Sequence, residues 1–377
     1  MMILILSPYH GGSHAAWAEG YRRYSQLRVE LLTLPARFWK WRMHGGAVTL
    51  ARAFMAGDWQ PDLILATDMV DLTTFLALTR SRTAAIPTAL YLHENQLTYP
   101  LPADPTSGPM RRQKGERDLH YAFINYSSML AADRLFFNSQ FHRQALLAAL
   151  PNFLKHFPDY QELDSLDGLA AKSERLPVGV DLRRLSQADG RPKPEPPLIL
   201  WNQRWEYDKN PADFFRALSA IKETGLPFRL ALCGENFRRQ PAEFSQALAS
   251  LASHIIHAGY AKDGDYRRLL AEAAVVVSTA QHEFFGISMI EAIYSGAYPL
   301  LPHRLSYPEL IPPAFHPHCL YENFAGLVDR LQWALTHPQE RDERGRLLAT
   351  AVTQYDWAKQ AARYDERLCI AHSPACC

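Results

Sequence analysis

Two glutamates stand eight residues apart in the segment VVVSTAQHEFFGISMIEAIYSGAYPLLP, residues 275–302. An apolar run predicts a strand at the start of this segment, and Gly286 precedes a helix expected to begin near Ile287. On one continuous helix Glu283 and Glu291 would lie about 80° apart, so we expect Glu283 in the loop before the helix. Both carboxylates can then reach one ligand. Spacing alone leaves open the alternative that Glu283 caps the helix and Glu291 is solvated.

The start of the same helix is a candidate anion site. The backbone N–H groups of Gly286, Ile287 and Ser288 precede the hydrogen bonds of the helix, and the helix dipole favours negative charge at this end. The pattern predicts that a phosphate group binds there.

Two cations follow another predicted strand, in LILWNQRWEYDKNP, residues 198–211. Arg204 offers a planar fork of donors and Lys209 a mobile ammonium group, and together they can neutralise a diphosphate and stabilise it as a leaving group. The alternative is that both are ordinary solvated loop charges.

The string KDGDY, residues 262–266, contains an Asp-x-Asp pattern that in other proteins holds a divalent cation. Because Asp263 and Asp265 directly precede the helical pattern YRRLLAEAA, we interpret them as residues that cap free N–H groups at a helix start. No metal site is predicted.

In the N-terminal half, a predicted strand runs into SPYHGGSHAAWAEGY, residues 7–21. Two successive glycines permit a tight turn, and Ser13 is suited to cap the helix that follows. The loop is not a GxGxxG dinucleotide motif. We predict that Gly12 lies near the donor and that His10, Ser13 and His14 face the acceptor, although a plain strand-to-helix turn explains the same residues.

A second polar cluster ends the apolar strand of LYLHENQLTYP, residues 90–100. The cluster is His93, Glu94, Asn95 and Gln96. Ligands of α/β proteins bind at the carboxyl ends of parallel strands, so we place these residues in the site. His93 is a candidate catalytic residue for positioning or proton handling, although a lone histidine is often only structural. Glu94 is the rival candidate, as a general base for an acceptor hydroxyl.

Rings and cations alternate in LPARFWKWRMHGG, residues 34–46, and the two glycines at its end are expected to stop the segment. Residues 21–52 hold seven Lys and Arg against one Glu, although the whole chain has a net charge of only +1. Cations that follow phosphates, interleaved with rings that stack on unpaired bases, are typical of single-stranded RNA recognition. The residues predicted to contact RNA are Arg37, Trp39, Lys40, Trp41 and Arg42, with Arg111, Arg112 and Lys114 in a later loop. The alternative is partly buried rings with a solvated charged face.

The elements that must position these residues follow an α/β pattern. Short apolar runs alternate with helical patterns, which predicts parallel sheets covered on both faces. The predicted strands are residues 3–6, 29–34, 63–66, 89–92, 134–137, 198–201, 229–232, 255–257, 275–278 and 298–301. The proline-rich segment 188–198 is the expected linker. We therefore predict one domain at 1–190, a second domain at 191–355 and a C-terminal helix at 356–377 that packs back across the halves.

Composition narrows the class of protein. The chain has 377 residues, 40 Lys and Arg against 39 Asp and Glu, and five cysteines without the spacing of a zinc site or a disulfide framework. Its first apolar run is too short to span a bilayer. These features favour a cytoplasmic protein without a membrane anchor.

The C-terminal half resembles the retaining glycosyltransferases of the family that includes sucrose and glycogen synthases. The resemblance rests on Arg204, Lys209, the Gly234 turn and the EFFGISMIE segment. It implies a GT-B fold, with two facing Rossmann-like domains, a catalytic cleft between them and no required metal. On this resemblance, residues 1–190 form the acceptor-side domain and residues 191–355 the nucleotide-sugar-binding domain. It further implies that Arg204 and Lys209 hold the diphosphate. It implies that Glu291 binds the ribose of the donor and that Glu283 contacts the sugar hydroxyls. It also implies that the amides of residues 286–288 bind the phosphates. The residues that it places near the base are Gly234, Glu235 and Asn236.

A narrower resemblance covers both halves. The strings SPYHGGSH, LPARFWKWRMHGGA, YLHENQLTYP and RDLHYAFINYSSMLAADRLFFNSQFHR are similar to the tRNA-queuosine mannosyltransferase group. The resemblance implies GDP-mannose as donor, queuosine in the anticodon of tRNA-Asp as acceptor, retention at the anomeric carbon, and His93 beside the donor sugar. The alternatives are a lipid, polysaccharide or small-molecule acceptor, or a nucleotide- or RNA-binding module without transfer chemistry.

Overall fold

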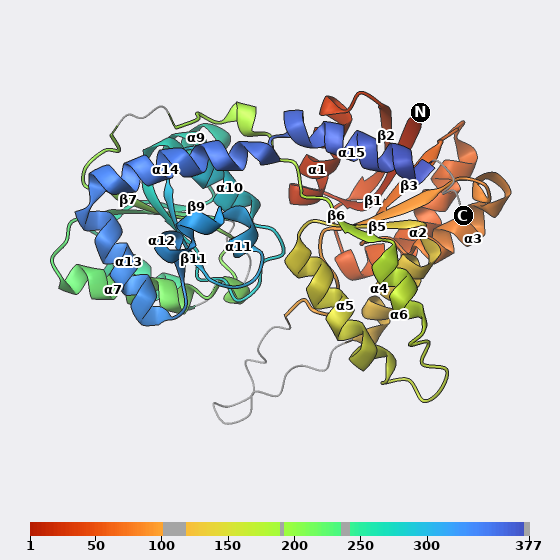
Figure 1. Ribbon diagram of the computed structural model, residues 1–377, viewed down its shortest axis with the longest axis horizontal. Coiled ribbons are helices and arrows are strands. Elements are labelled where there is room, and N and C mark those ends of the chain that lie inside the picture. The colour runs from red at the N-terminus through yellow and green to blue at the C-terminus, as the bar shows by residue number, and fades with distance from the viewer. Residues whose placement is uncertain (101–117, 189–191, 235–241, 373–377) are drawn as a thin grey trace. The chain divides into compact units, whose positions relative to one another are not determined.

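The computed structural model describes residues 1–100, 118–188, 192–234 and 242–372 (Figure 1). The chain forms two compact units, one of Met1–Gly179 with Trp357–Cys377 and the other of Val180–Asp356. The division precedes the predicted boundary at 190/191. Its physical reason is that the chain enters and leaves the second unit side by side, because Val180 forms a β-bridge with Asp356 and its amide donates to the carbonyl of Tyr355 at 2.8 Å.

The first unit contains a six-stranded parallel sheet in the order β2-β1-β3-β4-β5-β6. Its strands are β1 (Met2–His10), β2 (Arg28–Pro35), β3 (Leu63–Thr67), β4 (Thr88–Leu92), β5 (Arg134–Phe137) and β6 (Ser173–Arg175). β3 and β4 are buried at every position, as expected of strands covered on both faces. Successive strands are added to one side of β1 and then to the other, so the strand order reverses between β1 and β3. Ligands of open parallel sheets bind at the carboxyl ends of the strands at such a point.

Seven α-helices of this unit lie within the described ranges: α1 (Gly12–Tyr24), α2 (Trp39–Ala56), α3 (Leu72–Thr83), α4 (Leu119–Ala131), α5 (Gln140–Leu154), α6 (Ser165–Ala171) and α15 (Trp357–His372). The C-terminal helix α15 runs beside α1 (Figure 1). The indole of Trp17 donates to the hydroxyl of Tyr364 at 3.0 Å, and the hydroxyl of Tyr21 donates to Asp365 at 2.8 Å. These buried contacts join the last helix to the first one.

The second unit has a parallel sheet in the order β12-β11-β10-β7-β8-β9. Its strands are β7 (Leu198–Asn202), β8 (Arg229–Cys233), β9 (Ile255–Gly259), β10 (Ala273–Val277), β11 (Tyr298–Pro302) and β12 (Leu320–Tyr321). Its helices are α7 (Pro211–Glu223), α8 (Ala242–Ser250), α9 (Asp263–Glu272), α10 (Ile287–Tyr294), α11 (Tyr307–Leu310), α12 (His316–Cys319), α13 (Phe324–Thr336) and α14 (Pro338–Val352). Short 3-10 turns in this unit are η1 (Leu182–Arg184), η2 (Tyr207–Lys209), η3 (Pro313–Phe315) and η4 (Thr353–Tyr355). This strand order is that of the Rossmann fold, and it reverses between β7 and β10.

All ten predicted strands are present. The sequence analysis missed the two edge strands β6 and β12, because runs of three and two residues are too short to show a hydrophobic period.

Candidate functional site

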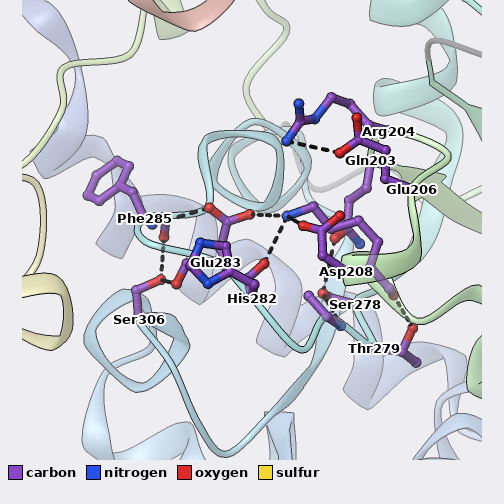
Figure 2. Close-up of polar contacts among 12 residues, drawn as sticks. Gln203, Arg204, Glu206, Asp208, Ser278, Thr279, His282, Glu283, Phe285 and Ser306 are labelled. Carbon is purple, nitrogen blue, oxygen red and sulfur yellow. Dashed lines mark hydrogen bonds and ion pairs between the residues drawn. The ribbon is translucent and has the colours of Figure 1, made fainter. Parts of the chain in front are cut away.

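The loops after β7 and β10 meet at the point where the strand order of the second unit reverses, and Figure 2 shows their polar contacts. The hydroxyl of Thr279 donates to the carbonyls of Lys209 and Asn210 at 2.9 and 2.8 Å. The amide of Gln281 donates to the carbonyl of Asp208 at 2.8 Å. These bonds fix the two loops to each other, so the side chains they carry have defined positions.

Lys209 is the centre of this arrangement. Its ammonium group donates to the carbonyl of His282 at 2.9 Å and to Glu283 Oε2 at 3.3 Å, and it lies 3.2 Å from Asp208 Oδ2. Lys209 is 6% exposed. The alternative of a solvated loop lysine is therefore wrong, and the two predicted residues Lys209 and Glu283 are brought into direct contact.

The charges of this pair stabilise each other. Burial by itself lowers the pKa of Lys209, but the carboxylates of Glu283 and Asp208 outweigh it and raise the pKa above its ordinary value. Burial likewise raises the pKa of Glu283, but Lys209 and the amide of Phe285 outweigh it and the pKa is lowered. Both groups are ionised at neutral pH. The amide of Phe285 donates to Glu283 Oε1 at 3.2 Å, so Glu283 acts within its loop and is not a cap of α10.

The start of α10 has the predicted geometry. Gly286 adopts a left-handed conformation with φ 103°, which favours glycine, and the helix begins at Ile287. The first hydrogen bonds of the helix run from the amides of Met289 and Ile290 to the carbonyl of Gly286. The amides of Ile287 and Ser288 therefore precede the ladder, as a phosphate site at a helix start requires.

Glu291 is buried, at 8% exposed, so the alternative of a solvated helix residue is wrong. Its Oε1 pairs with Arg184 and its Oε2 accepts a 2.7 Å hydrogen bond from the hydroxyl of Tyr266. Sequence reasoning missed both partners. A signal existed for Tyr266, since it lies in the KDGDY string that was considered only for its carboxylates.

Asp263 and Asp265 lie in the first turn of α9, but the N-cap position is Lys262 and makes no side-chain capping bond. The capping interpretation is corrected to ion pairing, because Asp263 pairs with Arg184 and Arg267, each at 3.1 Å, and Asp265 lies 3.7 Å from Arg268.

Arg204 and Gly234 complete the described donor residues. Arg204 follows β7, is about half-exposed and pairs with Glu206 at 3.3 Å. Gly234 follows β8, and a Cβ atom placed on it would lie 2.2 Å from the carbonyl oxygen of Gln203. The backbone of the Arg204 loop thus approaches a position that only glycine can occupy. The predicted residues Glu235 and Asn236 lie outside the described residues.

In the first unit, His93 follows β4 and its ring contacts those of His14 and Trp17, with centroids 4.6 and 4.7 Å apart. Burial and the neighbouring His14 lower the pKa of His93 well below its usual range, so the ring is neutral at pH 7. His93 Nε2 has no hydrogen-bond partner within the described part of the chain. Burial and His10 lower the pKa of His14 to about 4.

Asp68 is a functional candidate that sequence reasoning missed. It follows β3, is 1% exposed, and its Oδ1 accepts the amide of His93 at 2.9 Å. Burial and then the charge of Glu94 raise the pKa of Asp68 well above its usual value. An acidic residue directly after an apolar strand was the signal that could have identified it.

Two predictions for this unit are corrected. Asn95 is fully buried, and its Oδ1 accepts the amides of Leu97 and Thr98 at 3.1 and 2.7 Å, so it shapes the loop and is not open to an acceptor. Ser13 does not cap α1, because the N-cap is Gly11, which makes no side-chain bond.

Two other residues predicted to contact the acceptor, His10 and Gln96, make polar contacts with neighbouring side chains. His10 lies 3.5 Å from Glu19, and Gln96 donates to Glu94 at 3.0 Å. Gly12 has φ 51°, which suits the predicted tight turn.

The segment 37–42 forms an aromatic and cationic surface at the start of α2. Phe38 is 77% exposed, Trp41 63% and Trp39 37%, so the rings are not core residues. Lys40 lies 5.7 Å from the ring of Trp39 and 5.5 Å from that of Tyr121 on α4. Arg42 donates to the carbonyl of Pro35 at 3.1 Å, which ties its side chain to the end of β2.

Gly45 and Gly46, at the end of residues 34–46, do not stop the helix, contrary to the prediction. α2 continues through them to Ala56. A Cβ atom on Gly45 would lie 2.6 Å from the ring of Trp41, and one on Gly46 would lie 3.0 Å from Pro8. The glycines make room for close packing. Arg111, Arg112 and Lys114 lie outside the described residues. Among the described helices, none has the length and apolar composition needed to cross a bilayer.

His282 beside Lys209 gives the protein a predictable response to acid. It is 7% exposed, and burial together with Lys209 lowers its pKa to about 4 from 6.5. Between these values the unfolded chain binds a proton that the folded chain does not, so stability falls as the pH falls through this window. Linkage predicts that His282 removes about 2 kcal/mol of unfolding free energy between pH 7.5 and pH 5. Urea titrations of wild type and His282→Asn should therefore show a difference that shifts in favour of the variant at pH 5; a pH-independent difference would contradict the prediction.

Comparisons with known proteins agree with this geometry. Residues 2–180 match the tRNA-queuosine alpha-mannosyltransferase N-terminal family, and residues 183–346 match the glycosyl transferases group 1 family. The tRNA-queuosine alpha-mannosyltransferase of Drosophila melanogaster is 32% identical over 322 residues, which are 82% of this chain and 81% of the relative. A GDP-mannose:cellobiosyl-diphosphopolyprenol alpha-mannosyltransferase of Xanthomonas oryzae is 22% identical over 190 residues, 49% of this chain and 50% of the relative.

Solved structures show the same fold. The sucrose-phosphate synthase of Thermosynechococcus elongatus has a TM-score of 0.69 at 15% identity and covers 99% of this chain and 100% of its own. The structure of Anabaena HepE in complex with UDP has a TM-score of 0.67 at 15% identity, and the match covers 98% of this chain and 100% of the HepE chain. These structures support a GT-B fold of two Rossmann-like units. Together with the identity over four fifths of the chain, the two family matches show that this glycosyltransferase belongs to the tRNA-queuosine alpha-mannosyltransferase family.

Proposed function

We propose that this protein transfers mannose from GDP-mannose to queuosine in the anticodon of tRNA-Asp, with retention at the anomeric carbon. The observation that carries the proposal is the match of residues 2–180 to the N-terminal family of the tRNA-queuosine enzymes, joined to a glycosyltransferase site in the second unit. The Drosophila melanogaster relative and two relatives from Xanthomonas are named as mannosyltransferases, and the names of the two Xanthomonas proteins include GDP-mannose. We propose that the reaction takes place in the cytoplasm, which a tRNA acceptor favours.

The donor contacts follow from the second unit. Charge develops on the diphosphate as the bond to the sugar breaks, so groups that stabilise the leaving phosphates lower the barrier. Lys209, Arg204 and the amides of Ile287 and Ser288 supply positive charge and donors of this kind. Lys209 now donates to Glu283, so a bound phosphate would share its ammonium group while Glu283 turns to the sugar hydroxyls. With these cations in place we propose that no metal is needed.

The acceptor contacts follow from the first unit. The exposed rings of Phe38 and Trp41 offer faces for unpaired anticodon bases, and Arg37 and Lys40 offer charge to the backbone phosphates. We propose that His93 and Asp68, at the ends of β4 and β3, lie near the modified base, with the neutral ring of His93 as a hydrogen-bond partner.

Incubation with GDP-mannose radiolabelled in the sugar tests the function directly. We expect acid-precipitable label with tRNA-Asp that contains queuosine and background label with the same tRNA lacking it. Label that does not depend on queuosine would refute the acceptor. Label from UDP-glucose but not from GDP-mannose would refute the donor.

The exposed rings give a separate prediction. Phe38→Ala with Trp41→Ala is expected to weaken tRNA binding about tenfold or more, because each stacked base contributes about 1–3 kcal/mol. Slow hydrolysis of GDP-mannose should remain unchanged. Tyr160→Ala is the matched control, because Tyr160 is 86% exposed but does not belong to the aromatic and cationic surface of residues 37–42. Filter binding measures the tRNA affinity. Equal losses of tRNA binding and hydrolysis would show that the rings are structural.

A further inference from the structure

The carboxylate of Glu291 is held at both oxygens by side chains from other parts of the second unit. Arg184 in η1 pairs with Oε1, and Tyr266 in α9 donates to Oε2 at 2.7 Å. The contact with Arg184 joins residues that are 107 positions apart in the chain. Glu291 therefore has one defined orientation, which the helix alone does not impose.

A second set of contacts holds these two partners. The side-chain amide of Asn202, at the end of β7, donates to the hydroxyl of Tyr266 at 3.2 Å and to the carbonyl of Ser288 at 2.8 Å. Arg184 also donates to Asp263 at 3.1 Å. Because Tyr266 accepts from Asn202, its own proton is directed to Glu291. The network connects the carboxylate to the same first turn of α10 that offers amides to phosphate.

Charge explains why such a network is needed. A carboxylate close to a diphosphate site repels the ligand unless a cation neutralises it. Arg184 supplies that cation, and Tyr266 stays protonated because burial and the Glu291 carboxylate raise its pKa well above the ordinary value. Each carboxylate oxygen has two lone-pair positions, and the network uses one on each oxygen. One acceptor position on each oxygen remains for a ligand with two adjacent hydroxyl groups.

We propose that Arg184 and Tyr266 are positioning residues that orient and neutralise Glu291 so that it accepts both ribose hydroxyls of the nucleoside diphosphate donor. The inference rests on the proposed function only in that the ligand is a ribonucleoside diphosphate. It makes recognition of the ribose a property of three residues from η1, α9 and α10.

The test compares ligands with and without the ribose hydroxyls. Calorimetry would measure Kd of GDP and 2′,3′-dideoxy-GDP, and of the matching UDP pair, for wild type, Arg184→Met and Tyr266→Phe. We expect wild type to prefer the ribose form by at least about tenfold, because the dideoxy form loses two hydrogen bonds to a charged acceptor. In both variants the preference should fall to less than threefold. Kd for the dideoxy form should change less than threefold in Tyr266→Phe, whereas Arg184→Met leaves Glu291 without its cation beside the diphosphate and should weaken the binding of both forms.

Arg267→Met is the matched control. Arg267 is about half-exposed and pairs with the same Asp263 at 3.1 Å, but it is not a partner of Glu291 in the described contacts. Its preference for the ribose form should equal that of wild type.

The outcomes separate the inference from the proposed function. Losses of affinity that leave the preference for the ribose form at its wild-type value would show a structural role and overturn the inference, even if mannose transfer to tRNA is intact. A wild-type protein that does not distinguish the two forms would also overturn it. If UDP binds and GDP does not, the donor assignment fails, and the UDP pair decides the inference. If neither base binds, both proposals fail.

Discussion

Replacing Lys209 with methionine is expected to lower kcat for mannose transfer about 10²-fold, the size of the loss when one charge-stabilising donor is removed from an active site. Lys209 is buried between Asp208 and Glu283, so its ammonium group has a fixed position beside the predicted phosphate site. The affinity for tRNA should stay within twofold of wild type, because the predicted RNA surface belongs to the other unit. Single-turnover transfer and filter binding measure the two quantities.

Loss of this lysine also has a cost in stability. Asp208 and Glu283 would be left without their cation, and breaking a buried pair costs about 3–5 kcal/mol. A comparison of ligands distinguishes catalysis from unfolding: Lys209→Met should weaken GDP binding but leave guanosine binding nearly unchanged. Lys222→Met is the control, since Lys222 is an exposed lysine of α7 that donates only to the carbonyl of Ser250 within the described contacts. A folded Lys209→Met variant with kcat within threefold of wild type would refute the role of Lys209.

The strands and the placement of Lys209 and Glu283 in one site were accessible from sequence because they depend on local patterns. Apolar runs mark strands, and polar residues directly after those runs mark the sheet edge where ligands bind. Both residues follow predicted strands, and the contact at 3.3 Å confirms that the two loops meet. The position of Gly286 before a helix was predictable for the same reason.

The partners of Glu291 were not accessible in this way. Arg184 and Tyr266 lie 107 and 25 residues from it, and no local spacing relates them. The predictions for Asn95 and Gly45 were wrong for another reason. An asparagine in a polar loop is usually exposed, and a glycine after a short aromatic run usually ends a helix. Here tertiary packing determines the conformation at both positions. Asn95 satisfies loop amides, and Gly45 makes room for the Trp41 ring within a continuous helix.

Gly234→Ala is expected to reduce transfer about 10²-fold, because displacements near 1 Å at reacting groups have effects of this order. The added methyl group would lie 2.2 Å from the carbonyl oxygen of Gln203 and 2.9 Å from the ring of Trp205. Backbone cannot yield as a flexible side chain can, so the loop that carries Arg204 must shift. We also expect a loss of about 1–3 kcal/mol of unfolding free energy from this overpacking. Transfer kinetics and urea unfolding measure the two effects.

Gly264→Ala is the control that separates close packing from the loss of a glycine as such. A Cβ atom on Gly264 meets nothing within 4 Å, and the residue lies inside α9. Alanine is favoured over glycine in a helix by about 0.5–1 kcal/mol, so this variant should be as stable as wild type or slightly more so, with full activity. If Gly234→Ala also keeps full activity, the backbone around Gln203 tolerates a shift, and the position of Arg204 is not what limits transfer. If activity is lost while GDP binds normally, the displaced loop acts on the transition state rather than on the bound donor, because an interaction lost only in the transition state lowers kcat without changing ground-state affinity.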